Sequence, residues 1–116
     1  MSETIYRLKS EWIDGHKLVK TVDTHDIAFF VYDDETEELG KGLWDTFGTW
    51  FCVSDGTAFM GEMFYEDICD CIDCLRSGEY DGIFSQKAIN ECIEDYEAMR
   101  IICEEENEDF FQIYIL

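Results

Sequence analysis

The length of 116 residues and the mass of 13.6 kDa suit a single domain, residues 1–116, that can bury its own hydrophobic core. Hydrophobic residues make up 47% of the chain and aromatic residues 16%, which excludes a disordered acidic tail because such tails lack apolar material to bury. The net charge of −20 at pH 7 disfavours anionic partners such as nucleic acids and membrane surfaces, and it favours a basic protein partner.

The negative charge is unevenly distributed along the chain. Residues 1–20 carry a net charge of +1, whereas residues 21–116 carry −21. Between Glu62 and Asp109 there are sixteen acidic residues and three basic ones, a local charge of −13. Adaptation to high salt would spread charge over the whole surface, so the localised acidity indicates a binding role.

The N-terminal stretch MSETIYRLKSEW has no apolar core of a signal peptide, and no apolar run approaches the ~20 residues of a membrane span. We therefore expect a cytoplasmic protein. Its six cysteines are then expected to be reduced thiols, because disulfides are rare in that compartment.

Two β-hairpins are predicted in the first half of the chain. Residues 4–22 form the first, with its turn at Asp14-Gly15, and residues 49–60 form the second around Ser54-Asp55-Gly56. Between them, the apolar run Asp26–Asp33 is expected to be a central strand covered on both faces. The four basic residues of the first hairpin fit the protection of an exposed strand edge.

Residues 33–38 read as a solvated acidic loop that ends near Gly40 and Gly42. Alternating acids resemble an EF-hand loop, but the required Gly and Glu are replaced by Glu38 and Trp44, so we expect no calcium site. Residues 44–51 are rich in Trp and Phe, and we expect them in a turn and then a strand, either as core side chains or as an anchor for a partner.

The pattern becomes helical after Gly61. One helix is predicted from Phe64 to Ser77-Gly78, and a second follows the predicted N-cap Ser85. The expected buried residues are Phe64, Ile68, Cys71, Ile72 and Leu75 on the first helix, and Ile89, Cys92, Ile93, Tyr96, Met99 and Cys103 on the second. Residues 110–116 are predicted to return as a final strand.

The sequence therefore predicts an α+β fold, in which an antiparallel sheet of about five or six strands built from hairpins packs against two amphipathic helices.

Cysteines are the most reactive residues in the sequence. Cys69, Cys71 and Cys74 form a C-x-C-x-x-C pattern that suggests a metal-binding or redox protein. On a helix, however, Cys69 and Cys71 point about 200° apart, so we interpret the cysteines as structural and expect no metal and no cofactor. Neither His16 nor His25 belongs to a catalytic motif, and we predict that the protein is not an enzyme.

The charge is large enough to imitate a nucleic acid. A domain of this size is roughly 34 Å across, and duplex DNA of that length carries about 20 charges. Carboxylates at i and i+4 of a helix lie ~6 Å apart along its axis, comparable to the spacing of phosphates.

In size, charge and aromatic-rich α+β pattern, the sequence resembles the small acidic inhibitors of phages and mobile elements, the anti-CRISPR and anti-restriction proteins. This resemblance implies a non-enzymatic inhibitor that mimics nucleic-acid charge in a bacterial host cell and blocks the groove of a defence nuclease, either a CRISPR effector or a restriction enzyme. An immunity protein that neutralises a nuclease toxin is the alternative, with the cysteine-rich metal-binding or redox protein as another.

The predicted partner-binding residues are all acidic and come from the loop, the two helices and the turn that follows them. They are Asp33, Asp34, Glu35, Glu37, Glu38, Glu66, Asp67, Asp70, Asp73, Glu91, Glu94, Asp95, Glu104, Glu105, Glu106 and Glu108.

Overall fold

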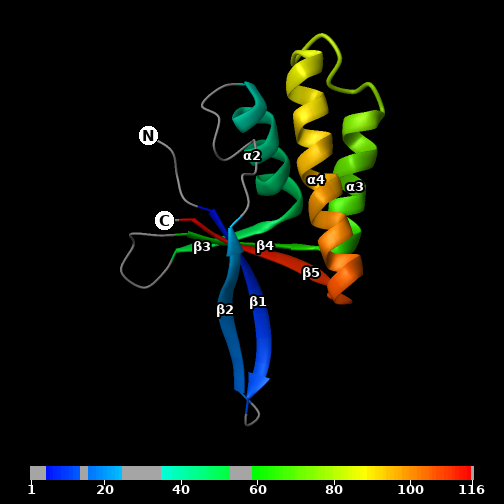
Figure 1. Ribbon diagram of the computed structural model, residues 1–116. Coiled ribbons are helices and arrows are strands. Elements are labelled where there is room, and N and C mark those ends of the chain that lie inside the picture. The colour runs from blue at the N-terminus through cyan, green and yellow to red at the C-terminus, as the bar shows by residue number, and fades with distance from the viewer. Residues whose placement is uncertain (1–4, 14–15, 25–34, 53–58, 116) are drawn as a thin grey trace.

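The computed structural model describes residues 5–13, 16–24, 35–52 and 59–115 (Figure 1). They form an α+β fold, as predicted, in which three helices lie together on one side of an antiparallel sheet. None of these helices combines the length and the apolar character that a membrane crossing requires.

The described strands are arranged in the order β2-β1-β5-β4-β3, and each pairs antiparallel with its neighbours. Their bounds are Ile5–Ile13 (β1), His16–Thr24 (β2), Thr49–Cys52 (β3), Phe59–Phe64 (β4) and Phe110–Ile115 (β5). The last strand in the chain therefore lies between the two hairpins. The antiparallel strand pairs of both predicted hairpins and the final strand are confirmed. The predicted turns at 14–15 and 54–56 lie outside the described residues.

The β1–β2 hairpin extends beyond the rest of the sheet. Residues Ile5–Leu8 of β1 pair with β5, whereas β1 pairs with β2 as far as Ile13. Figure 1 shows this hairpin protruding on the side away from the helices.

The helices are α2 (Glu35–Phe47), α3 (Tyr65–Arg76) and α4 (Gln86–Glu106). Helix α4 lies between α2 and α3 and packs against both (Figure 1). Its N-terminus is capped by Ser85, whose side chain accepts a hydrogen bond of 3.2 Å from the Ala88 N–H, as predicted. It ends at Asn107, whose φ of 55° is a left-handed conformation that Asn tolerates.

The core lies between the three helices and the helix-facing side of the sheet. Trp44, Ile68, Cys92, Tyr96 and Ile113 are each fully excluded from solvent. The apolar faces predicted for α3 and α4 are buried, apart from Phe64, which is exposed, and Ile93, which is half-buried.

The prediction of a loop at residues 33–38 is wrong for residues 35–38, which form the start of helix α2. Glu35, Glu37 and Glu38 lie in its first turn, where negative side chains interact favourably with the helix dipole and stabilise the helix. Trp44 belongs to the helix rather than to a turn. The buried side of α2 is made by Thr36, Leu39, Gly40, Leu43 and Trp44, at helical spacing. The described residues thus contain three helices, one more than the two predicted.

Strand β4 continues to Phe64 rather than ending before Gly61. A Cβ added at Gly61 would lie 2.9 Å from side-chain atoms of Trp44, Trp50 and Ile113. The glycine therefore gives the two indole rings room to pack on the strand. The predicted central strand at 26–33 lies outside the described residues, so the predicted total number of strands stays a prediction.

Candidate functional site

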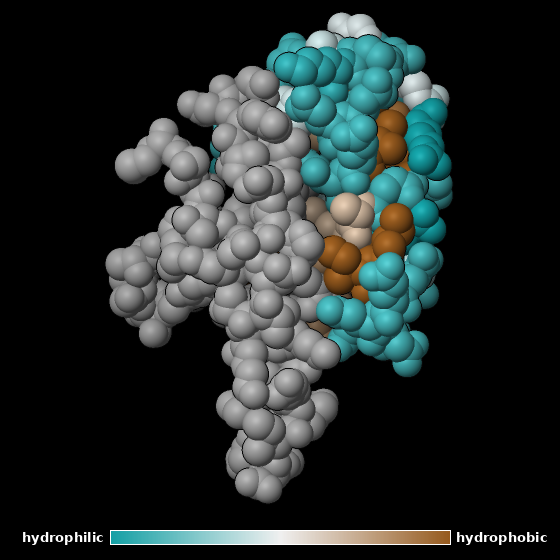
Figure 2. All heavy atoms as spheres, in the orientation of Figure 1, coloured by the Kyte–Doolittle hydropathy of each residue, from teal (hydrophilic) through white to brown (hydrophobic). Residues whose placement is uncertain are grey.

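The outer surface of α3 is the most regular acidic feature of the structure. Glu66, Asp70 and Asp73 are exposed and, at 100° per residue, lie opposite the buried side of α3. Asp67 is half-buried on the flank of the same helix. In the view of Figure 2, the described surface is largely hydrophilic, with apolar side chains gathered near its middle.

The acidic residues of α4 fall into two groups. Glu94 and Glu105 are exposed on its outer side, together with Glu104 and Glu106 near its C-terminus. The second group, Asp95 and Glu91, is half-buried, as is Glu108 in the turn beyond the helix.

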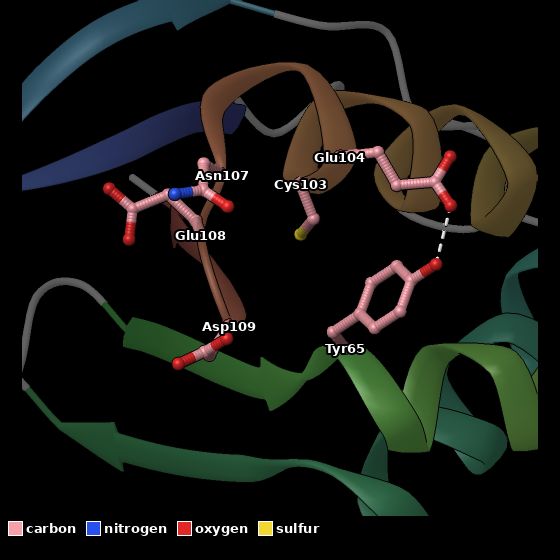
Figure 3. Close-up of a pocket in the computed structure, with 6 residues that line it drawn as sticks. All are labelled: Tyr65, Cys103, Glu104, Asn107, Glu108 and Asp109. Atoms are coloured by element: carbon pink, nitrogen blue, oxygen red, sulfur yellow. Dashed lines mark hydrogen bonds between the residues drawn. The ribbon is translucent and has the colours of Figure 1, made fainter.

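Arginines in the groove between α3 and α4 bind acidic residues of the protein itself. Arg76 Nη2 lies 3.0 Å from Glu97 Oε1, and Arg100 Nε donates to Glu97 Oε2 at 3.1 Å. Arg100 Nη1 also reaches Glu104 Oε2 at 3.4 Å, and Tyr65 donates its hydroxyl to the same oxygen (Figure 3). The positive charge of the groove is thus compensated locally, and it does not neutralise the outer acidic row.

This groove contains a surface pocket of about 270 Å³. Its lining is formed by Cys69, Ile72, Asp73, Arg76, Glu97 and Arg100. Because both arginines already contact Glu97, the pocket has no basic side chain that is free of an internal ion pair. It is therefore poorly suited to binding an anion.

Tyr65 is held in its neutral form at the edge of this network. The pKa of Tyr65 is raised to about 12. Its hydrogen bond to Glu104 is the largest cause, and partial burial and the nearby Cys69 add to it. The phenol therefore acts as a hydrogen-bond donor at neutral pH.

A second pocket, of about 300 Å³, lies where α4 turns into β5 (Figure 3). Its lining is formed by Tyr65, Cys103, Glu104, Asn107, Glu108 and Asp109. Glu104 points toward Tyr65, whereas Glu108 and Asp109 extend away from it on the other side of the pocket (Figure 3). The described lining contains three carboxylates and no cation, so this pocket suits a positively charged group.

Several predicted binding residues have contacts within the fold. Glu35 accepts a 3.1 Å hydrogen bond from the Ser85 N–H, and Glu37 lies 2.6 Å from Lys41. Glu91 accepts a 2.8 Å hydrogen bond from the buried Thr36, which joins α4 to α2. These carboxylates stabilise the helical layer.

Other predicted residues of the same region differ in their environment. Glu38 is exposed on α2, and Asp33 and Asp34 lie outside the described residues. The bond from Ser85 to Glu35 places the start of α2 beside the start of α4, at the end of α4 opposite to Glu104. The acidic residues of α2 and those at the C-terminus of α4 thus do not form one cluster.

The cysteines of α3 and α4 follow the predicted pattern of burial. Cys71, Cys92 and Cys103 are buried, whereas Cys69 and Cys74 are half-buried. Burial, followed by the negative charges of neighbouring groups, raises the pKa of the Cys71 and Cys74 thiols. Within the described part of the chain, no three His, Cys, Asp or Glu side chains are grouped to hold a metal.

Native alkylation tests this arrangement. Iodoacetamide at neutral pH is expected to label Cys69 and Cys74 well before Cys71, Cys92 and Cys103, because accessible thiols react first. Peptide mass spectrometry measures the order, with urea-unfolded protein as the control in which all six cysteines of the chain react. Rapid labelling of Cys71, Cys92 and Cys103 in the folded protein, or an acceleration by a chelator, would contradict the structural role of these thiols.

Sequence reasoning missed the network in the groove. The spacing of Glu97, Arg100 and Glu104 along α4 is a signal for part of it, because residues three and four apart are neighbours on a helix. The contact between Arg76 and Glu97 depends on how α3 and α4 are packed, and no local pattern reveals it.

Comparison with protein-family models, curated proteins and solved structures finds no match to this chain.

Proposed function

We propose that this protein is a non-enzymatic inhibitor that imitates nucleic-acid charge and binds the basic groove of a bacterial defence nuclease. The observation that carries the proposal is the exposed row of Glu66, Asp70 and Asp73, which remains negative because the nearby arginines are paired in the groove. Such a row attracts Arg and Lys side chains and speeds association with a basic partner.

The spacing of the row supports this role. At 1.5 Å per residue, the three carboxylates are separated by about 6 and 4.5 Å along the axis of α3. One strand of duplex DNA presents a phosphate every 3.4 Å of axis, so the two charge densities are of the same order. Glu94 and Glu105 are likewise exposed on the outer side of α4 and add to the negative charge of the helical layer.

A charge-reversal experiment tests the proposal. Glu66→Lys with Asp70→Lys is expected to weaken binding by at least ~100-fold, because each charge-assisted hydrogen bond contributes about 1.5–3 kcal/mol. The partner is captured from lysates of bacteria that carry CRISPR or restriction systems and is then purified. Affinity is measured at rising salt concentrations, and DNA cleavage by the captured nuclease is measured with and without the protein.

The matched control is Glu79→Lys with Asp81→Lys, which changes the charge equally in the exposed loop between α3 and α4. It is expected to weaken binding far less. Equal losses in the two variants would show that only the total charge matters, and capture of proteins without nucleic-acid-binding activity would refute the proposal. Capture of one nuclease toxin would instead identify an immunity protein.

A further inference from the structure

Phe64 is an exposed aromatic residue at the junction between β4 and α3. Its side chain is 56% exposed, although the helical pattern predicts burial. The reason is that Phe64 is still extended, with φ −69° and ψ 151°, so it follows the alternation of the strand. Met63 points into the core and is 1% exposed, which directs Phe64 to the opposite face of the sheet.

The position of Phe64 is fixed by its neighbours. Phe64 pairs with Phe110 across β4 and β5, and their rings meet edge to face with centroids 6.4 Å apart. Next to this pair, the Tyr65 N–H donates a 2.7 Å hydrogen bond to the Asp109 carbonyl. The ring is therefore held in place before any partner arrives, which lowers the entropy cost of binding.

Carboxylate residues flank this aromatic pair along the chain. Glu66 is exposed two residues after Phe64, and Glu108 and Asp109 directly precede Phe110. Residues next to both phenylalanines, Tyr65 and Asp109, also line the acidic pocket of Figure 3. The Phe64–Phe110 pair thus directly adjoins, along the chain, two residues of the acidic pocket.

The net charge of the protein favours one kind of binding partner for the exposed Phe64–Phe110 pair. A second copy of the chain would bring another net charge of −20 and would be repelled. A cationic segment would be attracted, and a guanidinium group can both pair with a carboxylate and stack on an aromatic face. The occupant with the best chemical fit is therefore an arginine-bearing protein segment.

We propose that Phe64 is an aromatic anchor on which an arginine of the partner stacks, while carboxylates beside it bind the neighbouring basic side chains. The inference rests on the proposed function and deepens it, because the ring takes the place of a nucleobase and the carboxylates take the place of phosphates. It assigns the partner to proteins that contact unstacked bases, since bases buried in a duplex offer no free ring face.

Two peptides of equal charge, octa-arginine and octa-lysine, test the inference by isothermal titration calorimetry on the full chain. The acidic row should bind both, and stacking on Phe64 should strengthen the binding of octa-arginine about threefold more than that of octa-lysine. Phe64→Leu is therefore expected to lower the ratio of octa-arginine to octa-lysine affinity about threefold, mainly through weaker binding of octa-arginine. Phe64→Trp should preserve or increase the ratio.

Ile101→Ala is the matched control, because Ile101 is another exposed hydrophobic residue, at 45%, on α4. It should leave both affinities unchanged. An equal ratio in the wild type and in Phe64→Leu overturns the inference and leaves the acidic row intact. Failure of octa-lysine to bind the wild-type protein overturns the proposed function as well.

Discussion

Replacing Trp44 by Ala is expected to lower the free energy of unfolding by about 3–5 kcal/mol, the cost of removing a buried tryptophan. Trp44 is fully excluded from solvent, and its ring lies 5.6 Å from that of Trp50, centroid to centroid. The indole fills the space that Gly61 leaves open on β4, so its loss creates a cavity between α2 and the sheet. Small domains are stable by only about 5–15 kcal/mol, so the variant should be near the limit of folding.

Urea unfolding followed by far-ultraviolet circular dichroism measures this effect without relying on tryptophan fluorescence. Trp44→Phe is the graded variant and should lose less than Trp44→Ala. Ile101→Ala, at an exposed site, should change stability by less than ~0.5 kcal/mol. A loss below ~1 kcal/mol in Trp44→Ala would mean that Trp44 is not part of the core.

Alkaline pH is expected to destabilise the protein through Tyr96. This side chain is fully buried, and its hydroxyl donates a 2.9 Å hydrogen bond to the Gly40 carbonyl. Burial is the main cause that raises the pKa of Tyr96 well above its ordinary value of 10.0, and the nearby Cys71 and Cys92 add to it. The unfolded chain then loses the phenolic proton first, so the stabilisation is complete below pH 10 and disappears as the pH rises above it.

For the fully buried Tyr96, the slope is about 1.4 kcal/mol per pH unit between its unfolded and folded pKa values. The pKa of Tyr65 and of Tyr80 is also raised, and both add to the effect at high pH. Urea midpoints measured from pH 7 to pH 11.5 should therefore fall steeply near the upper end.

Tyr96→Phe separates the contribution of this residue. At pH 7 it should cost about 1–3 kcal/mol, because the Gly40 carbonyl loses its buried donor. Above pH 10 the difference from the wild type should shrink, since the variant no longer has the phenol that ionises. Parallel stability curves for the two proteins would contradict a raised pKa of Tyr96.

Periodicity predicted α3 and α4 because their apolar residues recur at helical spacing and their ends carry clear signals at Ser77 and Ser85. It missed α2 because the acidic run and the two glycines at 40 and 42 resemble a loop. The buried side of α2 includes Gly40 itself, whose carbonyl binds Tyr96 on a helix far along the chain. Contacts with a distant helix therefore stabilise α2, and such contacts cannot be read from the local composition.

The candidate site was predictable to a similar degree. Exposure of Glu66, Asp70 and Asp73 follows from the helical period, and the sequence identified them. Glu91 was also predicted to bind a partner, yet its half-buried carboxylate accepts a bond from Thr36. Phe64 was expected to be buried because the helix was taken to begin there, whereas Phe64 is the last residue of β4 and α3 begins at Tyr65.

The place of β5 in the sheet has a consequence for folding during synthesis. Strand β5 pairs with β1 and β4, so it joins segments that are far apart along the chain. The β1–β2 hairpin and the α3–α4 pair depend on nearby residues and can form while the chain is still emerging from the ribosome. The sheet can close only after Phe110–Ile115 have emerged, so the slow, long-range step of folding comes last.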